Sequence, residues 1–459
     1  MKFSRIEKHF NRIVGENNVI VEQMALEPYQ RDWCQQFKGQ TKIAVLPTTT
    51  QQASEIVRFC YQHQLSLIPA GGRTGLSGGM TPVNGEIILS LEKIRHIENF
   101  CPIQKKVMVG AGLINHELQQ WLCRHNLMWP IHLASSGSCQ IGGNLSTNAG
   151  GVHVIRYGHA RRWCLGMTFV DGTGVIHQYG HHLIKNNSGY DYSKLLIGAE
   201  GTLGVITEAT LQLVDKPQDL TVVWLSLRDL GQGLAFIEQL RCNSPYTIHA
   251  CEFLSHQCLE IQSDPKPPSQ AAPYYLLISL DNTASQQPVE DWLAALLAQQ
   301  AYFIDAVIAS SEEQANKLWR YREEITVSIA PIGLVLKNDI SVPIKQLLGY
   351  LQSVEQLIKV HLKQSQLFLF GHLGDGNVHV NLVFTEPNNP LSGLAEFSAL
   401  HGQLLHSLNG SLSAEHGIGL LKKEQLKYMR SATEIDMMRR LKLQYDPGGI
   451  LNPGKILSS

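Results

Sequence analysis

Two histidines in the C-terminal part of the chain are spaced so that a β-hairpin would bring them together. His372 and His379 lie in residues 367–381, where two apolar runs flank a Gly-Asp-Gly turn, a composition typical of a tight hairpin. A carboxylate, Glu415, follows within the glycine-flanked residues 413–419. Two imidazoles and a carboxylate can coordinate a divalent metal ion and leave positions open for a substrate. The spacing alone leaves a second interpretation equally open, in which these residues are two turn histidines and a glutamate at the start of a helix.

The second strand of this hairpin is predicted to have one apolar face and one polar face. Val378 and Val380 alternate with His379 and Asn381, and successive side chains of a strand point to opposite faces. We therefore expect His379 and Asn381 to project from the same face of a sheet.

Three glycine-rich segments occur earlier in the chain, at residues 71–79, 135–151 and 197–206. Five glycines fall within the nine residues of the first segment, which indicates a backbone that must approach another group closely. The small residues and backbone amides of the second suit a diphosphate and a ribityl chain. A glycine-rich loop packed for its own sake is the alternative. No segment has the pattern of a Rossmann fold or a P-loop, so both are poor fits.

Composition limits the classes of function. A chain of 459 residues with 44% hydrophobic and 17% charged residues is expected to form two or three globular domains. The net charge of −1 gives no electrostatic footprint for nucleic acid or an anionic membrane. The nine cysteines are scattered and include no C-x-x-C, which favours reduced thiols and a cytoplasmic location. No signal peptide or transmembrane run is visible, and peripheral association with the inner membrane face is left open.

The order of predicted elements places these residues in an α+β chain. In the first part we expect a helical lead-in over residues 1–40, a strand at 45–46 followed by a threonine-capped helix, strands at 65–70, 86–91 and 106–109, a helix at 115–125 and a hairpin at 167–179. Composition changes after residues 213–218. Beyond them we expect strands at 220–227, 274–280 and 334–343 and helices at 231–242, 289–300, 312–330, 344–361, 397–408 and 422–443, ending in a turn-rich tail at 445–455. The first of these strands and helices form two successive β-α-β units, which resemble a ferredoxin-like layer with helices on one face of a sheet.

Taken together, these stretches resemble the FAD-dependent oxidoreductases of the vanillyl-alcohol oxidase and p-cresol methylhydroxylase type, and within them the D-2-hydroxyacid dehydrogenases. The resemblance covers nearly the whole chain and rests on residues 69–79, 137–151, 200–204 and 451–454, and on the pairing of residues 372–379 with Glu415, His416 and Gly417. It implies a two-part FAD-binding domain at residues 1–215 and a ferredoxin-like α/β cap domain for substrate and metal at residues 216–420. A C-terminal helical segment, residues 421–459, would return to the FAD domain.

The resemblance also implies which residues hold the cofactor. The glycine segments would bind the FAD phosphates through main-chain N–H groups. FAD is expected to be held non-covalently, because no histidine precedes the first glycines and Cys139 is expected to be a buried structural thiol. Arg73 stands where asparagine is usual in the hydroxyglutarate-oxidising members. The predicted FAD-binding residues are Pro69, Ala70, Gly71, Gly72, Arg73, Thr74, Gly75, Leu76, Ser135, Gly137, Ser138, Ile141, Gly142, Asn144, Thr147, Asn148, Gly150, Gly151, Glu200, Gly201, Gly204, Val205, Ile206 and Asn452.

For the reaction, the resemblance implies a metal held by His372, His379 and Glu415, with zinc or manganese expected and iron or cobalt compatible with the same ligands. His416 would take the substrate hydroxyl proton while hydride passes to the flavin. Substrate binding falls to the side chains that match the substrate-carboxylate site, together with His416 and a hydrogen bond from Asn381. The residues matching that carboxylate site are Arg322, Thr326 and Lys337.

The resemblance implies oxidation of a D-2-hydroxyacid to the 2-oxoacid, and it favours D-2-hydroxyglutarate because the family members that act on lactate or glycolate lack a lysine at the position of Lys337. D-lactate or glycolate dehydrogenation is the alternative within the family. An FAD-dependent alcohol or sugar oxidase and a non-catalytic subunit of a glycolate-oxidase-like complex are alternatives outside it. Reoxidation would come from an external acceptor such as electron-transfer flavoprotein or a quinone, and a homodimer is left open.

Overall fold

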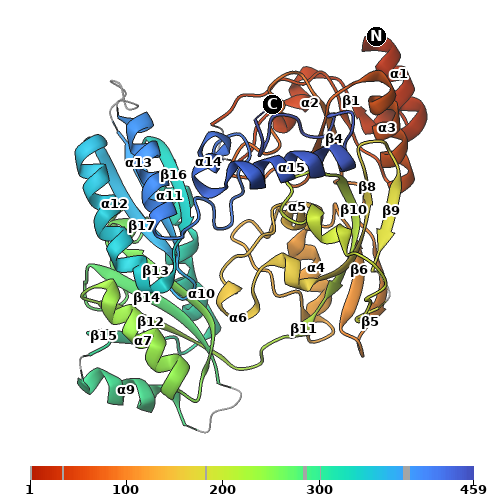
Figure 1. The fold of residues 1–459 in the computed structure, drawn as a ribbon. Helices are drawn as coiled ribbons and strands as arrows, with labels where there is room; N and C mark the ends of the chain where they lie inside the picture. The colour runs from red at the N-terminus through yellow and green to blue at the C-terminus, as the bar shows by residue number, and fades with distance from the viewer. Residues whose placement is uncertain are drawn as a thin grey trace. The chain divides into compact units, whose positions relative to one another are not determined.

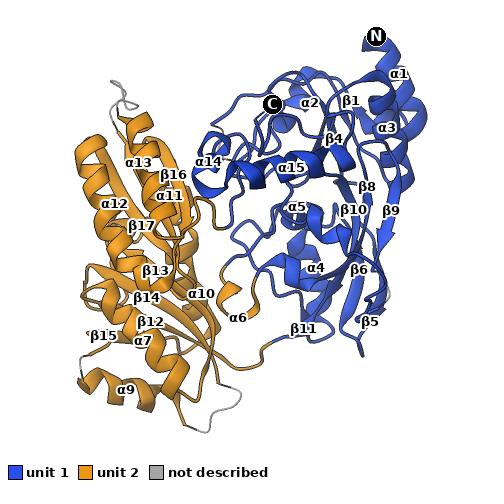
Figure 2. Ribbon diagram, viewed as in Figure 1, with its two compact units in different colours: residues 1–151, 159–216, 415–459 blue, residues 152–158, 217–414 orange. Residues whose placement is uncertain are grey.

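The computed structural model describes residues 3–33, 36–180, 183–282, 287–299, 301–385 and 393–458. Cys34 and the last residue of the predicted 289–300 helix lie outside the described residues. The chain forms two compact units (Figure 2): unit 1 contains residues 1–151, 159–216 and 415–459, and unit 2 contains residues 152–158 and 217–414. The division into an FAD-binding domain, a cap domain and a C-terminal segment assigns a function to each part of the chain, and it stays a prediction.

The described part of unit 1 contains a four-stranded sheet, a five-stranded sheet and a short two-stranded pair (Figure 1). The first has the order β1 (Val19–Ile20), β2 (Ala44–Val45), β4 (Ile87–Ser90) and β3 (Leu67–Ala70). The second has the order β5 (Ile97–Cys101), β6 (Lys106–Gly110), β10 (Val205–Gln212), β8 (Cys164–Val170) and β9 (Ile176–Tyr179). A short pair joins β7 (Leu127–Met128) to β11 (Val214–Asp215). The α-helices of this unit are α1 (Phe3–Val14), α2 (Gln23–Leu26), α3 (Thr50–His63), α4 (Asn115–Cys123), α5 (Ile141–Ser146), α14 (Leu426–Met429) and α15 (Ala432–Tyr445).

Helix α3 forms where the threonine cap was predicted. The Thr49 hydroxyl accepts a hydrogen bond from the Gln52 N–H at 3.2 Å, which satisfies one of the donors left open at a helix start. The buried side chains of α3, among them Ile56 and Val57, pack in one core with Leu67 and Leu89 of the parallel strands β3 and β4. This β-α-β arrangement ends β3 at Ala70, directly before the first glycine-rich segment.

The predicted single helix over residues 422–443 is wrong. The chain leaves helix after α14 and starts again at Ser431, whose side chain caps the Glu434 N–H while Glu434 accepts from the Ser431 N–H, a complete capping box. The tail then returns to the first sheet of unit 1, where the Leu67 N–H donates to Ile450 O at 2.8 Å and the Asn452 N–H donates to Leu67 O at 2.7 Å.

Unit 2 is built on one seven-stranded antiparallel sheet. Its order is β15 (Asp305–Ile308), β12 (Leu220–Leu227), β14 (Tyr274–Asp281), β13 (Thr247–Ser255), β17 (Ser365–His372), β18 (Asn377–Phe384) and β16 (Leu334–Ser341). Helix α7 (Leu230–Asn243) follows β12, and α9 (Val289–Gln299) follows β14, so the first four strands make the β-α-β-β-α-β order of a ferredoxin-like layer. The other α-helices are α6 (Val154–Tyr157), α8 (Gln257–Glu260), α10 (Glu312–Glu323), α11 (Ile325–Ile329), α12 (Leu347–His361) and α13 (Leu394–Ser407).

The two helices of the ferredoxin-like layer share one face of the sheet, as predicted, since the rings of Phe236 on α7 and Trp292 on α9 lie 5.8 Å apart. Helices α10 and α11, which follow this layer in the chain, cover the other face. Leu318 of α10 and Ile325 of α11 pack in one core with Trp224 and Phe370. Gly233 of α7 lies instead against Leu227, which points to the opposite face from Trp224 because the two residues are an odd number apart on β12. The predicted 312–330 helix is divided into α10 and α11 at Glu324. Across the described parts of the chain, no helix combines the length and the apolar character needed to cross a bilayer.

Candidate functional site

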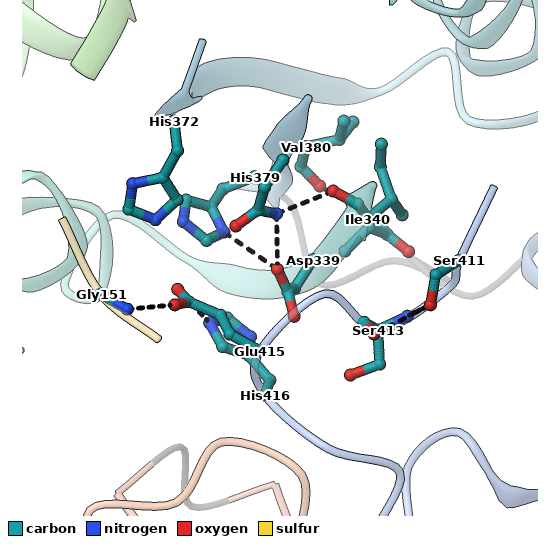
Figure 3. Close-up of polar contacts among 12 residues, drawn as sticks. Gly151, Asp339, Ile340, His372, His379, Val380, Ser411, Ser413, Glu415 and His416 are labelled. Carbon is teal, nitrogen blue, oxygen red and sulfur yellow. Dashed lines mark hydrogen bonds and ion pairs between the residues drawn. The ribbon is translucent and has the colours of Figure 1, made fainter. Parts of the chain in front are cut away.

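The predicted histidine hairpin is present in unit 2. Strands β17 and β18 are antiparallel and pair His372 with Asn377 and Phe370 with His379, leaving four residues in the turn. The ring centroids of His372 and His379 are 5.5 Å apart (Figure 3). Every residue of β18 is buried, so the polar face that carries His379 and Asn381 lies in the interior of the protein.

A second carboxylate, which the sequence did not predict, lies next to His379. Strand β16 pairs Asp339 with His379, and Asp339 Oδ1 is 3.6 Å from His379 Nδ1 (Figure 3). Asp339 is fully buried and also accepts a hydrogen bond from Asn377 Nδ2 at 2.9 Å. The side chains of Asp339 and His379 offer ligand atoms within 4.8 Å of each other. The available sequence signal was an acidic residue in strand 334–341, two positions after Lys337.

The residues just before Glu415 are hydrogen-bonded to β16, the strand that carries Asp339. Ser341 and Ser411 exchange two backbone hydrogen bonds, of 3.0 and 2.7 Å, and the Ala414 N–H donates to Asp339 O at 3.3 Å. Glu415 is the next residue in the chain. Within unit 1, Glu415 Oε2 accepts from the Gly151 N–H at 3.1 Å, and Glu415 Oε1 lies 3.8 Å from His416 Nε2 (Figure 3).

The predicted cofactor segments of unit 1 contact one another through their backbones. A Cβ atom on Gly72 would lie 2.1 Å from Ser138 O, so the first and second glycine-rich segments touch where only glycine fits. A Cβ on Gly201 would lie 3.2 Å from Pro69 Cγ, which places the third segment against the end of β3. Asn452 Nδ2 donates to Gly79 O at 2.9 Å and to Glu200 O at 2.7 Å, so the C-terminal tail joins the first and third segments.

Two family models match the chain: one described as FAD binding domain over residues 41–180, and one described as FAD linked oxidases, C-terminal domain, over residues 216–456. The second alone spans more than half of the sequence. The chain belongs to the family of FAD-linked oxidases.

Curated relatives of this FAD-linked oxidase extend over almost its full length. The chain is 35% identical to a D-2-hydroxyglutarate dehydrogenase of Stutzerimonas stutzeri, covering 97% of each chain. It is 37% identical to one of Xanthomonas citri pv. viticola, covering 95% of this chain and 93% of the relative. A mitochondrial D-2-hydroxyglutarate dehydrogenase of Bos taurus is 35% identical, with 97% of this chain and 82% of the relative covered.

Solved structures establish the fold of the FAD-linked oxidase. The structure of p-cresol methylhydroxylase with substrate bound superimposes with a TM-score of 0.77 at 17% identity, covering 99% of this chain and 97% of that chain. The 4-ethylphenol oxidase of Gulosibacter chungangensis superimposes with a TM-score of 0.74 at 16% identity, covering 100% and 98%. The mixed α and β fold predicted from sequence, of the vanillyl-alcohol oxidase type, is confirmed.

The space around several glycines of unit 1 is compatible with a cofactor such as FAD. Cβ atoms added to Gly75, Gly137 and Gly143 would meet nothing within 4 Å, so packing inside the protein does not require glycine at these positions. The first and second glycine-rich segments, which touch at Gly72, therefore also have stretches of backbone that no side chain of the protein covers. A cofactor lying along the main chain explains both observations, since side chains there would obstruct it.

Arg73 directs its side chain to protein partners. Its Nη1 donates to Glu92 Oε2 at 3.0 Å, and its guanidinium carbon lies 4.7 Å from the centroid of the Tyr29 ring. The backbone of Arg73 has a φ of 59°, the left-handed conformation that asparagine also adopts readily. Burial, followed by the Glu92 carboxylate, raises the pKa of Tyr29 to about 12.

Four of the five predicted substrate-binding residues lie in unit 2, and His416 lies in unit 1. Lys337 pairs with Asn381 two residues along from the Asp339 and His379 pair, so all four side chains project from one face of the sheet. Arg322, at the end of α10, is buried with its guanidinium 4.8 Å from the Phe370 ring centroid on that face. Thr326 is half-buried on α11, whose neighbouring Ile325 packs in the same core as Phe370.

Glu200 joins the third cofactor segment to the segment that follows His416. Its carboxylate accepts hydrogen bonds from the N–H groups of Ile418 at 2.6 Å and Gly419 at 2.9 Å. Ser77 holds the same segment, because its hydroxyl donates to His416 O at 3.1 Å. Burial raises the pKa of Glu200 to about 7, against the opposing effect of these hydrogen bonds and of Lys422.

Replacing Glu200 by glutamine is expected to change how stability depends on pH. The folded chain retains a proton on Glu200 up to about pH 7, whereas the unfolded chain loses it near 4.5, so the free energy of unfolding falls as pH rises through this window. Glu200→Gln removes this dependence, which amounts to a fall of up to about 3 kcal/mol in the free energy of unfolding between pH 4.5 and about pH 7. Urea unfolding of the full chain at pH 5, 6, 7 and 8 measures the free energy of unfolding, with substitution of Glu98, an exposed carboxylate on β5, by glutamine as the control. Parallel curves for wild type and Glu200→Gln would contradict the raised pKa.

Proposed function

We propose that this FAD-linked oxidase is a metal-assisted dehydrogenase that oxidises D-2-hydroxyglutarate to the 2-oxoacid. The observation that carries the substrate assignment is the match to enzymes named D-2-hydroxyglutarate dehydrogenase over 95% or more of this chain. The geometry that supports it is the row of polar side chains on one face of the paired strands β16 and β18, of which β18 is buried along its whole length.

The metal is proposed to be held by His372, His379 and Glu415, with zinc or manganese as the favoured ion. The donor set fits, since imidazole and carboxylate groups bind both ions. Asp339, paired with His379 and hydrogen-bonded through its backbone to the residue before Glu415, adds a further carboxylate. A metal bound there would lower the pKa of the substrate hydroxyl.

The remaining roles follow from the side-chain chemistry. FAD, when bound, supplies the acceptor for the hydride that leaves the substrate Cα. His416 accepts the hydroxyl proton on an unprotonated ring nitrogen, and Ser77 holds its backbone in place. Arg322 binds a substrate carboxylate through its planar guanidinium, Lys337 adds a point charge for the second carboxylate, and Thr326 and Asn381 contribute hydrogen bonds.

The cofactor segments and the division of the chain are proposed in the same way. The 24 positions predicted from sequence to bind FAD are proposed as its site, supported by the backbone contacts among the three glycine segments and Asn452. Residues 1–215 would form the FAD-binding domain, 216–420 the substrate and metal cap, and 421–459 the segment packed on the FAD domain. The family models at 41–180 and 216–456 support the boundary near residue 216.

Electrons would leave the flavin to an external acceptor, electron-transfer flavoprotein or a quinone. A cytoplasmic location is proposed from the thiol chemistry. The eight cysteines among the described residues are free, which suits a reducing compartment.

Dye-linked turnover tests the substrate assignment. FAD-loaded protein is assayed with D- and L-2-hydroxyglutarate, D-lactate and glycolate under the same conditions. We expect D-2-hydroxyglutarate to give the highest kcat/KM and the L-enantiomer to give turnover near background. Equal rates on the two enantiomers, or a higher kcat/KM on D-lactate, would contradict the proposal.

A Lys337→Ala variant separates a dicarboxylate substrate from a monocarboxylate one. Loss of a charge-assisted hydrogen bond of about 1.5–3 kcal/mol lowers kcat/KM for D-2-hydroxyglutarate by about 10- to 100-fold. Any turnover of D-lactate should stay within twofold, because lactate has no second carboxylate. Lys345→Ala, an exposed lysine nearby in sequence, is the control. Parallel loss on both substrates would count against a role for Lys337 at the second carboxylate.

A further inference from the structure

Glu252 is a fully buried carboxylate in the middle of the unit 2 sheet. It lies on β13, a strand that the sequence did not predict, and its side chain has no exposed surface. Strand β13 pairs Glu252 directly with His372 of β17, so the two side chains project from the same face. A buried ionised carboxylate is costly unless it is paired and hydrogen-bonded.

The two oxygens of Glu252 bind two different partners. Oε1 is 2.5 Å from His372 Nδ1, and Oε2 accepts from Arg322 Nε at 2.8 Å. A carboxylate on Nδ1 places the imidazole proton there and leaves the lone pair of a neutral ring on Nε2. A metal-binding histidine almost always donates its other ring N–H to such an acceptor, whether a carboxylate, a backbone carbonyl or a water, and the acceptor fixes the tautomer and orientation of the ring.

The contact with Arg322 orients a second functional group. Because Glu252 uses Nε, the two terminal nitrogens of the guanidinium are left for another acceptor. The guanidinium lies 4.8 Å from the ring centroid of Phe370, two residues before His372 on β17. Glu252 neutralises the charge of Arg322, and Glu252 and Phe370 together hold its side chain, which is only 10% exposed, in position.

We propose that Glu252 is a positioning residue that orients the metal ligand His372 and the substrate-binding Arg322 at the same time. This inference rests on the proposed function, which assigns those two roles. Glu252 itself touches neither metal nor substrate. Since one carboxylate serves both partners, its loss weakens metal binding and substrate binding together, whereas loss of a purely structural ion pair lowers stability alone.

Glu252→Gln tests the proposal because glutamine has the same shape but offers one acceptor oxygen and a nitrogen that donates. On FAD-loaded protein, Zn²⁺ affinity is measured without substrate by competition with a chromophoric chelator. We expect a 10- to 100-fold weaker Zn²⁺ affinity. KM for D-2-hydroxyglutarate is then measured at saturating Zn²⁺, where we expect a rise of at least tenfold. Glu252→Asp keeps the charge and is expected to fall between wild type and Glu252→Gln in both constants.

Asp281→Asn is the matched control. Asp281 lies on the neighbouring strand β14, is buried, and pairs with Arg156 at 2.7 Å without contacting His372 or Arg322. We expect this variant to melt at a lower temperature than wild type with both constants within twofold. Folded Glu252→Gln or Glu252→Asp protein with unchanged constants, or a wild type that binds no Zn²⁺, would overturn the proposal. A wild type that binds Zn²⁺ but does not turn over D-2-hydroxyglutarate would refute the proposed function, while the Zn²⁺ affinities would still decide the role of Glu252 toward His372.

Discussion

Replacing His416 by asparagine is expected to lower kcat for D-2-hydroxyglutarate by about 10²- to 10⁴-fold, the usual contribution of a positioned general base. Asparagine is close in size and polarity but cannot accept the hydroxyl proton. The backbone of residue 416 is held independently, through the hydrogen bond from Ser77 to His416 O and through Glu200, which binds the N–H groups of Ile418 and Gly419. The substitution should therefore remove the base without displacing the segment.

Anaerobic stopped-flow measurement of flavin reduction reports this step directly, because flavin absorbance is lost when hydride arrives. His406→Asn, at an exposed position on α13, is the control and should reduce flavin at the wild-type rate. Near-normal flavin reduction in His416→Asn would exclude His416 as the base and would direct attention to another acceptor for the proton.

Removing the metal is the second change with a large expected effect. A bound divalent ion supplies several kcal/mol of charge stabilisation, so chelation should lower turnover by about 10³-fold. Adding Zn²⁺ or Mn²⁺ back should restore the wild type. In His379→Ala, restoration should fail, because the substitution deletes an imidazole at the centre of the buried polar face and leaves Asp339 without its neighbour.

Metal content measured by elemental analysis separates this outcome from simple misfolding. His379→Ala should retain the flavin spectrum, since the predicted FAD segments lie in unit 1 and His379 lies in unit 2. His406→Ala should keep both metal and activity. Full activity of chelated, metal-free wild-type protein would refute metal assistance and leave Asp339 and His379 as a structural pair.

Local chemistry explains where sequence reasoning succeeded. The hairpin of β17 and β18 depends on a glycine turn between two apolar runs, and α3 depends on one threonine side chain that caps a nearby N–H. Both features involve neighbours in sequence. The alternation that predicted a common face for His379 and Asn381 is likewise a property of a single strand.

Errors arose where a short-range signal was overlooked or a pattern was ambiguous. The capping box at Ser431 and Glu434 was present in the sequence, yet the apolar periodicity of residues 422–443 continued through it and favoured one long helix. Strand β13 was missed because His249 and Glu252 interrupt its apolar pattern. In each case a polar residue carried information that hydrophobic periodicity does not contain.

Contiguous residues were enough to identify the family and the three glycine segments and to suggest His372, His379 and Glu415 as metal ligands, because motifs and turns are local features of the chain. The position of Asp339 beside His379, and the contacts of Glu252 with His372 and Arg322, became apparent from the folded sheet alone. Those pairings link residues 40, 120 and 70 positions apart, and they depend on the register of strands that no local pattern specifies. The role of a buried carboxylate in a strand can be inferred once the pairing of the strands shows which side chains it contacts.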